Sequence, residues 1–320
     1  MKIKPILIVA GEPNSIFIEI LIKSLVKKKF KSPILLVVSL KVFLLQMKRL
    51  KMNFPFKIID ENNLDNLILD NKKLNLININ YNIVHAFEKI SSKSNKYIER
   101  CFNLALKILK TGLTNKFING PVSKKYFLKD KFLGITEYLA KKTNTNNFAM
   151  LIYNKKFSVA PITTHLPIKL VSKNITKNLI IKKILLINNF YKNYFGINPK
   201  IAVTGVNPHC ESIDPFNEDK KITEPAVKYL KKKINVTGPV PADTVFLKNN
   251  RKKYDLIVGM YHDQVLTPMK TLCEYDAINI TIGLPFIRIS PDHGPNEKMI
   301  GKNVSSPLSL IKAITFLDKN

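Results

Sequence analysis

The sequence predicts an α/β fold, and three observations support this class. Short apolar runs typical of buried strands alternate along the chain with longer amphipathic segments typical of helices. The chain has 320 residues and 45% hydrophobic content, which is enough for one large or two moderate domains. Reactive side chains follow several of the predicted strands, at the sheet edge where α/β proteins bind ligands.

The predicted elements begin with a buried strand at 6–11 and an amphipathic helix at 15–29, for which Asn14 or Ser15 is the expected cap. A second strand spans 33–40. The segment 41–80 is rich in Lys, Asn and Leu and indicates no clear element. Later elements are a helix at 96–112, a strand at 116–120, a hairpin at 148–154 and 157–164, a helix at 175–196, strands at 200–205, 254–260 and 277–283, and a helix at 307–317.

Several classes of protein are disfavoured by composition. Apolar runs are short and broken by Lys or Asn, so no membrane span and no membrane partner are expected. The opening "MKIKPILIVAGEPNS" predicts a strand rather than a signal peptide, because its apolar run is short and Glu12 follows closely. The three cysteines form no C-x-x-C motif and are odd in number, so we expect no disulfide framework and a cytoplasmic location.

The formal net charge of +29 allows two interpretations. One is a polyanionic partner, which would make the chain a basic nucleic-acid-binding protein. The other is compositional drift, because the excess is mostly Lys, is spread along the whole chain and is mixed with many Asn and Ile. No Arg-rich arm or aromatic-plus-basic signature stands out, so we expect no nucleic acid partner. The charge would still attract an anionic substrate.

Three of the five histidines lie just past the C-terminal ends of predicted strands. His165 follows "VAPITT", His209 follows "IAVTGVNP" and His262 follows "DLIVGMY", whereas His85 is unrelated to a strand end. Three imidazoles from separate strand ends could hold a divalent metal with a position open for substrate. The competing interpretation is that each is an ordinary loop or core histidine, since no local H-x-x-x-H pair is present.

Carboxylates lie close to these histidines in the sequence. Asp263 adjoins His262, Asp292 adjoins His293, and Asp243 lies in the Gly- and Pro-bounded turn "GPVPADTVF". Such carboxylates could accept a proton or orient a histidine. The alternative for each is a helix cap or an Asx turn.

Lys270, Asn279 and Arg288 follow in order and together suit a phosphate or carboxylate. Arg288 is the most informative, because its apolar context "LPFIRIS" requires a partner, either an anionic ligand or a structural ion pair. No G-x-G-x-x-G, P-loop, G-x-S-x-G or H-E-x-x-H is present, so a Rossmann dinucleotide site is not supported.

The motifs in these segments resemble one enzyme family. The chain is similar to 4-hydroxythreonine-4-phosphate dehydrogenase, an enzyme of pyridoxal phosphate (vitamin B6) biosynthesis, over roughly 120–300. The segments that carry the resemblance are "GPVSK" (120–124), "TTHLP" (163–167), "GVNPH" (205–209), "GPVPADTVF" (238–246), "MYHDQVLTPMK" (260–270) and "INITIGLPFIRISPDHG" (278–294).

The resemblance implies two α/β/α domains flanking a cleft, like isocitrate and isopropylmalate dehydrogenases, which bind their nicotinamide cofactor without a Rossmann fingerprint. The first domain would comprise 1–120 plus 268–320, on the cofactor side. The second would comprise 121–267, on the metal and dimer side. The resemblance also implies a homodimer in which one metal ligand comes from the partner subunit.

The resemblance further implies particular roles. His165, His209 and His262 match the metal ligands, and the metal would be zinc, magnesium or cobalt. Thr136, Lys270, Asn279 and Arg288 match substrate-binding residues, with Asp243 and Lys270 in catalytic positions and His293 and Gly294 beside NAD or NADP. The implied reaction oxidises 4-phosphohydroxy-L-threonine, a small phosphorylated hydroxy amino acid, to a β-keto acid that decarboxylates to 3-amino-2-oxopropyl phosphate.

The chain departs from the family pattern at four places. It has "GEPNSIFIE" (11–19) in place of a glycine-rich run, Ile135 in place of a substrate-contacting His, "CESIDPFNED" (210–219) after Asn-Pro-His, and Pro295–Asn296 in place of Thr-Ala. Ile135 removes a polar contact that could distinguish an amino group from a hydroxyl. One alternative is therefore a sister enzyme of the same fold that oxidises another four-carbon phosphorylated acid, such as a phosphothreonate. Another is a degenerate metal-binding relative without catalysis.

Overall fold

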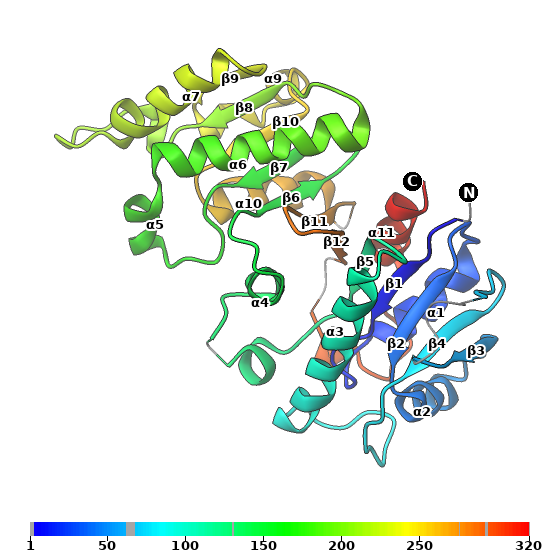
Figure 1. Ribbon diagram of the computed structural model, residues 1–320. Coiled ribbons are helices and arrows are strands. Elements are labelled where there is room, and N and C mark those ends of the chain that lie inside the picture. Colours follow the sequence, from blue (N-terminus) through cyan, green and yellow to red (C-terminus); the bar gives the residue numbers. More distant parts are fainter. Residues whose placement is uncertain (1–2, 62–67, 130, 275, 292–293, 320) are drawn as a thin grey trace. The chain divides into compact units, whose positions relative to one another are not determined.

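The computed structural model describes residues 3–61, 68–129, 131–274, 276–291 and 294–319. The chain groups into two compact units, Met1–Tyr138 with Pro285–Asn320 and Leu139–Leu284 (Figure 1). Each unit combines a sheet with helices packed on it, so the predicted α/β class is confirmed.

The sheet of the first unit is parallel throughout. Its central strands are buried on both faces, which accounts for their continuous apolar sequences, such as "ILIV" in β1 and "ILLVV" in β2. The strand order is β3(Phe56–Ile59), β4(Leu74–Asn78), β2(Ile34–Val38), β1(Ile6–Val9), β5(Lys116–Asn119) and β12(Ile287–Ser290).

Helices cover both faces of this sheet (Figure 1). Helix α3(Asn95–Lys110) packs on β1 and β2, and it buries Ile98, Phe102, Ala105 and Leu109 at helical spacing. Helix α11(Leu308–Asp318) packs on β1, β5 and β12 and contacts α1(Phe17–Lys27). The predicted helices at 15–29, 96–112 and 307–317 are therefore present.

The predicted cap of the first helix is wrong. Helix α1 begins at Phe17, one residue later than a Ser15 cap and two later than an Asn14 cap would give, and its N-cap Ile16 makes no side-chain cap bond. Ser15 Oγ instead accepts a hydrogen bond from Phe17 N at 3.3 Å and donates one to Glu12 O at 2.7 Å. Both polar candidates are buried here, because this loop turns inside the protein rather than at its surface.

The segment without a clear sequence pattern contains regular structure. Helix α2(Leu40–Leu50) begins immediately after β2, and the Ser39 hydroxyl accepts from Val42 N as its N-cap. Strands β3 and β4 then complete one edge of the sheet. Within the described part of the chain, no helix combines the length and the apolar character that crossing a bilayer demands.

The second unit has a mixed sheet. Strand β11(Ile278–Ile282) is antiparallel to β6(Ala149–Tyr153), which in turn is antiparallel to β7(Ser158–Pro161). The predicted hairpin is thus confirmed, with Ile152 opposite Val159. The order continues in parallel through β7, β10(Leu256–Gly259), β8(Ile201–Thr204) and β9(Val236–Val240).

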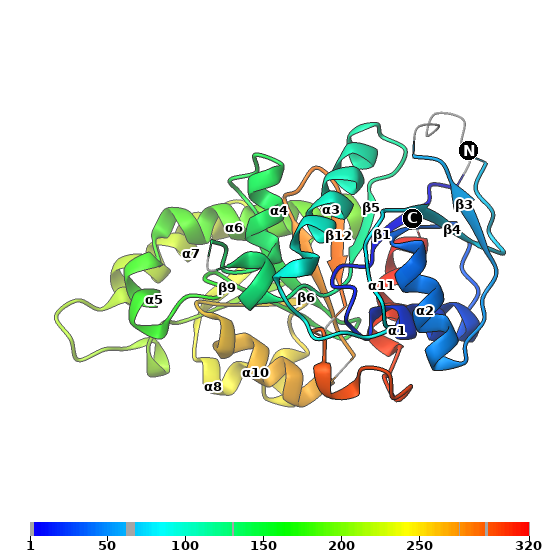
Figure 2. The same cartoon turned by 90° about the horizontal axis from the view of Figure 1, so that it is seen from below.

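Helices lie on both faces of this second sheet (Figure 2). On one face, α6(Lys177–Phe190) contacts β6 and β11 and packs beside α7(Glu224–Lys231). On the other, α10(His262–Cys273) contacts β7 and β10, and α8(Ala242–Val245) contacts β8. The long predicted helix is present and continues as a short π-helix to Gly196, whose φ of 68° ends it.

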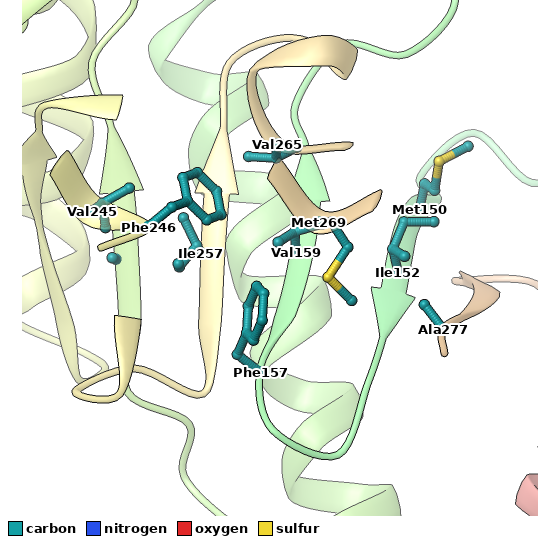
Figure 3. Close-up of a cluster of buried hydrophobic side chains, with 11 residues drawn as sticks. Met150, Ile152, Phe157, Val159, Val245, Phe246, Ile257, Val265, Met269 and Ala277 are labelled. Atoms are coloured by element: carbon teal, nitrogen blue, oxygen red, sulfur yellow. The ribbon is translucent and has the colours of Figure 1, made fainter. Parts of the chain in front are cut away.

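A hydrophobic cluster fixes α10 on the sheet (Figure 3). Val265 and Met269 of the helix pack against Val159 of β7, Ile257 of β10 and Phe157, which directly precedes β7. Full burial of side chains of this size contributes about 1.5–3 kcal/mol each. Because this packing holds α10 against the sheet, it also fixes the position of His262, the first residue of the helix.

The predicted domain boundaries, 1–120 plus 268–320 against 121–267, do not coincide with the two units. Residues 278–282 group with the second unit because β11 pairs with β6 along its whole length. Residues 121–138 group with the first unit because Tyr138 packs edge-on against Phe102, with ring centroids 5.7 Å apart.

The order of the strands changes direction at the carboxyl ends of β1 and β5. Strand β1 lies between β2 and β5, so the connections leave these neighbouring strands in opposite directions, and α/β proteins bind ligands at such a point. The two loops here approach closely: Glu12 N donates to Pro121 O at 2.8 Å, and Gly120 N donates to Val9 O at 2.7 Å. A Cβ on Gly120 would lie 2.1 Å from Ala10 O.

We therefore expect Gly120→Ala to lower the free energy of unfolding by about 1–3 kcal/mol, because a backbone carbonyl cannot yield as a flexible side chain does. Gly112→Ala is the control: its φ is +77° but nothing lies within 4 Å of the added Cβ, so only the left-handed strain of about 1–2 kcal/mol applies. Urea unfolding followed by circular dichroism measures both. Wild-type stability for Gly120→Ala would contradict the close approach of the two loops.

Candidate active site

Two of the three predicted metal ligands lie together in the second unit. His165 follows β7, and His262 follows β10 as the first residue of α10. Because β7 and β10 are paired and parallel, their carboxyl ends are neighbours. The two imidazole rings have centroids 5.6 Å apart and planes inclined at 39°.

A carboxylate orients one of these imidazoles. His262 Nδ1 lies 2.6 Å from Asp263 Oδ1, and the carboxylate can only accept a hydrogen bond. In the neutral imidazole the proton is therefore on Nδ1, which leaves the Nε2 lone pair for a ligand. This pairing of carboxylate and histidine is the arrangement that fixes metal-binding histidines in many sites.

His209 lies on a separate turn of the same unit. It belongs to the short 3-10 turn Pro208–Cys210 after β8, where it is exposed and has a φ of 56°. Among the residues that the structure describes, no three side chains of His, Cys, Asp or Glu gather closely enough to hold a metal ion. Within one chain, His209 therefore does not complete the pair formed by His165 and His262.

The remaining predicted residues of the second unit surround these strand ends. Asp243 is exposed on α8, which contacts the turn that carries His209. Lys270 lies on α10, about 12 Å along the helix axis from His262. Burial lowers the pKa of the Lys270 ammonium below its usual value.

Asn279 carries an unsatisfied oxygen. It lies on β11 opposite Ile152, and its Oδ1 is buried without a hydrogen-bond partner among the described residues. Buried polar oxygens in native proteins are nearly always hydrogen-bonded. A ligand that donates a hydrogen bond would satisfy this oxygen.

Arg288, the second residue of β12, pairs with Phe117 of β5, and its side chain reaches Asn119 at the carboxyl end of that strand. It is fully buried; its Nε donates to Asn119 Oδ1 at 2.7 Å, and its Nη1 donates to Thr136 Oγ1 at 2.8 Å. Burial lowers the pKa of the guanidinium to about 10, opposed by the nearby Glu137 carboxylate, so the charge persists at neutral pH. Thr136 and Arg288, both predicted to bind substrate, thus contact each other.

A cavity of about 170 Å³ lies beside this pair in the first unit. The residue Gly294, predicted to adjoin the cofactor, and the altered position Ile135 both line it. Asp292 and His293 lie outside the described residues. The cavity is lined by Asn119, Gly120, Pro121, Val122, Lys124, Leu128, Ile135, Ser290, Pro291 and Gly294.

Sequence reasoning missed Glu12 and Asn119. Glu12 is buried in the loop that follows β1, where its carboxylate accepts from Asn14 N at 3.1 Å and from Ser94 Oγ at 2.9 Å. Burial raises the pKa of this carboxyl. A signal was present in the sequence for both, because each is a polar residue at or directly after the end of an apolar strand, the criterion that singled out the histidines.

Comparisons with known proteins agree with the sequence motifs. Residues 29–317 match the family model described as pyridoxal phosphate biosynthetic protein PdxA. A 4-hydroxythreonine-4-phosphate dehydrogenase from Sulfurihydrogenibium is 38% identical, over 96% of this chain and 95% of its own. A D-threonate 4-phosphate dehydrogenase from Pectobacterium atrosepticum is 32% identical, over 97% of each chain.

Solved structures share the fold. The crystal structure of 4-hydroxythreonine-4-phosphate dehydrogenase from Klebsiella pneumoniae has a TM-score of 0.85 at 30% identity, and covers 98% of this chain and 97% of that one. A β-decarboxylating dehydrogenase from Thermococcus kodakarensis has a TM-score of 0.53 at 13% identity, covering 98% and 82%, and shares the fold alone. The predicted fold type and the predicted resemblance are both confirmed, and the chain belongs to the pyridoxal phosphate biosynthetic protein PdxA family.

Proposed function

We propose that this protein is a divalent-metal-dependent, NAD-linked dehydrogenase that oxidises 4-phosphohydroxy-L-threonine in pyridoxal 5'-phosphate biosynthesis. The β-keto acid formed would lose carbon dioxide to give 3-amino-2-oxopropyl phosphate. The observation that carries the proposal is the His165–His262 pair, oriented by Asp263, in a chain 38% identical to an enzyme named for this substrate.

The donor set fits a divalent metal such as zinc, cobalt or magnesium. Neutral imidazole nitrogens are the preferred ligands of the first two, and His262 offers Nε2 once Asp263 engages Nδ1. His209 of a second copy would supply the third ligand, which makes the active form a homodimer. When bound, the metal lowers the pKa of the substrate hydroxyl and the nicotinamide accepts the hydride.

Exposed apolar side chains beside His209 support the dimer. Ile213 is fully exposed and Phe216 is half-exposed in the loop that follows the His209 turn. Ile168, on the short helix α5(Ile168–Asn174), is 72% exposed, and Ser172 Oγ of that helix donates to Glu218 Oε1 at 2.6 Å next to the loop. A second copy covering these side chains would remove apolar surface from water while placing its site beside His209.

The other residues hold the substrate and move its protons. Asp243 can accept the proton of the hydroxyl, and the lowered pKa of Lys270 makes its amine a better proton carrier near neutral pH. Asn279 Oδ1 can accept a hydrogen bond from the substrate. We assign the cavity with Gly294 to the cofactor side, where Thr136 and Arg288 would hold the anionic end of the substrate.

A phosphothreonate is the second candidate substrate, and Ile135 favours it. This side chain lines the cavity of the first unit, and it cannot hydrogen-bond to the amino group that separates the two substrates. The Pectobacterium relative is named for D-threonate 4-phosphate. We place either enzyme in the cytoplasm, where Cys101, Cys210 and Cys273 would stay reduced.

We expect His209→Ala to lower kcat/KM for NADH formation by at least about 100-fold, because loss of a direct ligand exceeds the 10–100-fold typical of an indirect one. The assay follows NADH absorbance with 4-phosphohydroxy-L-threonine, NAD and Co²⁺. His85→Ala, which replaces an exposed histidine of the first unit, is the control and should keep wild-type activity. Full activity of His209→Ala, or of wild type after chelation, would exclude this metal site.

A mixing experiment tests the shared site. His209→Ala and His262→Ala homodimers should both be inactive, but a heterodimer joins the intact His165–His262 pair of one subunit to the intact His209 of the other. After denaturation and joint refolding, random pairing should restore about a quarter of wild-type activity, since half of the dimers would carry one intact site. If the mixture stays inactive while mixed wild-type chains recover, all three ligands come from one chain.

Ile135→His tests the substrate. A polar side chain in the cavity should change the ratio of kcat/KM between 4-phosphohydroxy-L-threonine and D-threonate 4-phosphate by about tenfold or more in favour of the amino substrate. Ile135→Leu keeps the apolar character and should leave the ratio unchanged. A ratio that is equal in all three proteins would show that Ile135 does not contact the distinguishing group.

A further inference from the structure

Hydrogen bonds link the strand ends that carry the three histidines. Thr163, two residues before His165, donates from both its backbone N, at 3.1 Å, and its Oγ1, at 2.8 Å, to Met260 O. Met260 is in turn two residues before His262. The end of β7 is thereby fixed to the end of β10.

Gln264 links β10 to β8. Its Oε1 accepts from Met260 N at 2.7 Å and from Thr204 Oγ1 at 2.8 Å, and its Nε2 donates to Gly205 O at 2.8 Å. One side-chain amide in the first turn of α10 thus fixes the backbone just before His262 to the backbone leading to His209. Both lone pairs of Oε1 are used, and the amide supplies the two acceptor sites and the donor that these three bonds need.

Glycines make room for this amide and for the loop beside it. A Cβ on Gly259 would lie 3.0 Å from Gln264 Oε1 and 2.4 Å from Val265 Cγ1. A Cβ on Gly205 would lie 3.0 Å from Asp219 Oδ1. The backbone therefore comes into direct contact with the side chains that hold it.

Asp219 fixes the turn between β8 and His209. It is fully buried; Oδ1 accepts from Val206 N at 2.7 Å, and Oδ2 accepts from Asn207 N at 3.0 Å. Within the described chain Asp219 makes no salt bridge, so its charge is balanced by amide donors alone. Burying a carboxylate in this way has a desolvation cost that an apolar side chain would avoid.

The turn that these side chains hold is strained. His209 and Cys210 are consecutive non-glycine residues with φ of 56° and 65°. Such conformations persist only where surrounding contacts impose them, and they concentrate at functional sites.

We propose that Gln264 and Asp219 are positioning residues that together hold the turn of His209 in the conformation from which its imidazole reaches the metal site of a second copy. Gln264 fixes the distance between the ends of β8 and β10, and Asp219 fixes the backbone conformation of the turn that carries His209. The functional role rests on the proposed metal site, whereas the effect on the loop does not require a metal.

The test uses Gln264→Glu in the full-length protein at neutral pH. A carboxylate of the same size cannot donate to Gly205 O and repels it. We expect Co²⁺ affinity to fall about 10–100-fold and the visible absorption band of bound Co²⁺ to change. We also expect kcat for the phosphorylated substrate to fall by a larger factor than KM changes. In the metal-free protein, the amides of residues 205–210 should exchange faster with deuterium than in wild type.

Asn75→Asp is the matched control. Asn75 is a fully buried amide of β4 in the first unit, and its Nδ2 donates to Ile34 O at 3.1 Å. The same amide-to-acid change should lower the melting temperature yet leave Co²⁺ affinity, the Co²⁺ spectrum and exchange at 205–210 unchanged. Asp219→Asn is the second variant, and it should speed exchange of the same segment. It provides the test if Gln264→Glu fails to fold.

The outcomes separate the two proposals. If wild type binds no Co²⁺, the proposed metal site is wrong, and hydrogen exchange at 205–210 alone decides the positioning role. If the variants keep wild-type Co²⁺ affinity, spectrum and exchange, the positioning role is overturned while the metal site stands. If Asn75→Asp has effects of equal size, Gln264 and Asp219 contribute only to overall stability and have no specific positioning role.

Discussion

Parallel strand pairing is the constraint on which this structure depends. Parallel strands deliver their carboxyl ends to one edge, so residues distant in sequence meet there without any local motif. His165 and His262 are nearly a hundred positions apart, yet their rings lie side by side because β7 and β10 are neighbours in register. In the first unit the same geometry brings Asn119 of β5 to Arg288 of β12.

Buried hydrogen bonds then convert this coarse placement into a defined geometry. A buried guanidinium or carboxylate without partners is costly, so each such group strongly favours the backbone arrangement that satisfies it. Arg288 joins two strands and a helix in the first unit, and Asp219 with Gln264 does the same for two loops in the second. Because a half-satisfied group costs more than an apolar one, such contacts specify one conformation more sharply than hydrophobic packing can.

Most buried strands were predictable from the sequence, because a short continuous apolar run bounded by glycine or lysine is typical of a strand covered on both faces. The sequence pattern missed α2 and β4, whose Lys and Asn content obscures the period of the apolar residues, and α10, which begins within the histidine motif and contains Pro268. His165 and His262 were predictable from their positions after strands. Gln264 and Asp219 were not, because nothing local shows that a polar side chain will be buried against a backbone that another segment provides.

The separation of His209 from His165 and His262 within one chain bears on the role of its turn. Buried Asp219, Gly205 and the left-handed residues His209 and Cys210 all contribute to the conformation of this turn. Among the described residues of the chain, however, His209 does not join two other ligands to form a metal site. An exposed histidine without a functional role would not require a turn held by buried contacts. These contacts support the proposal that His209 is a ligand in the site of a second copy, because a preformed turn beside the exposed Ile213 and Phe216 would lose little conformational freedom when that copy binds.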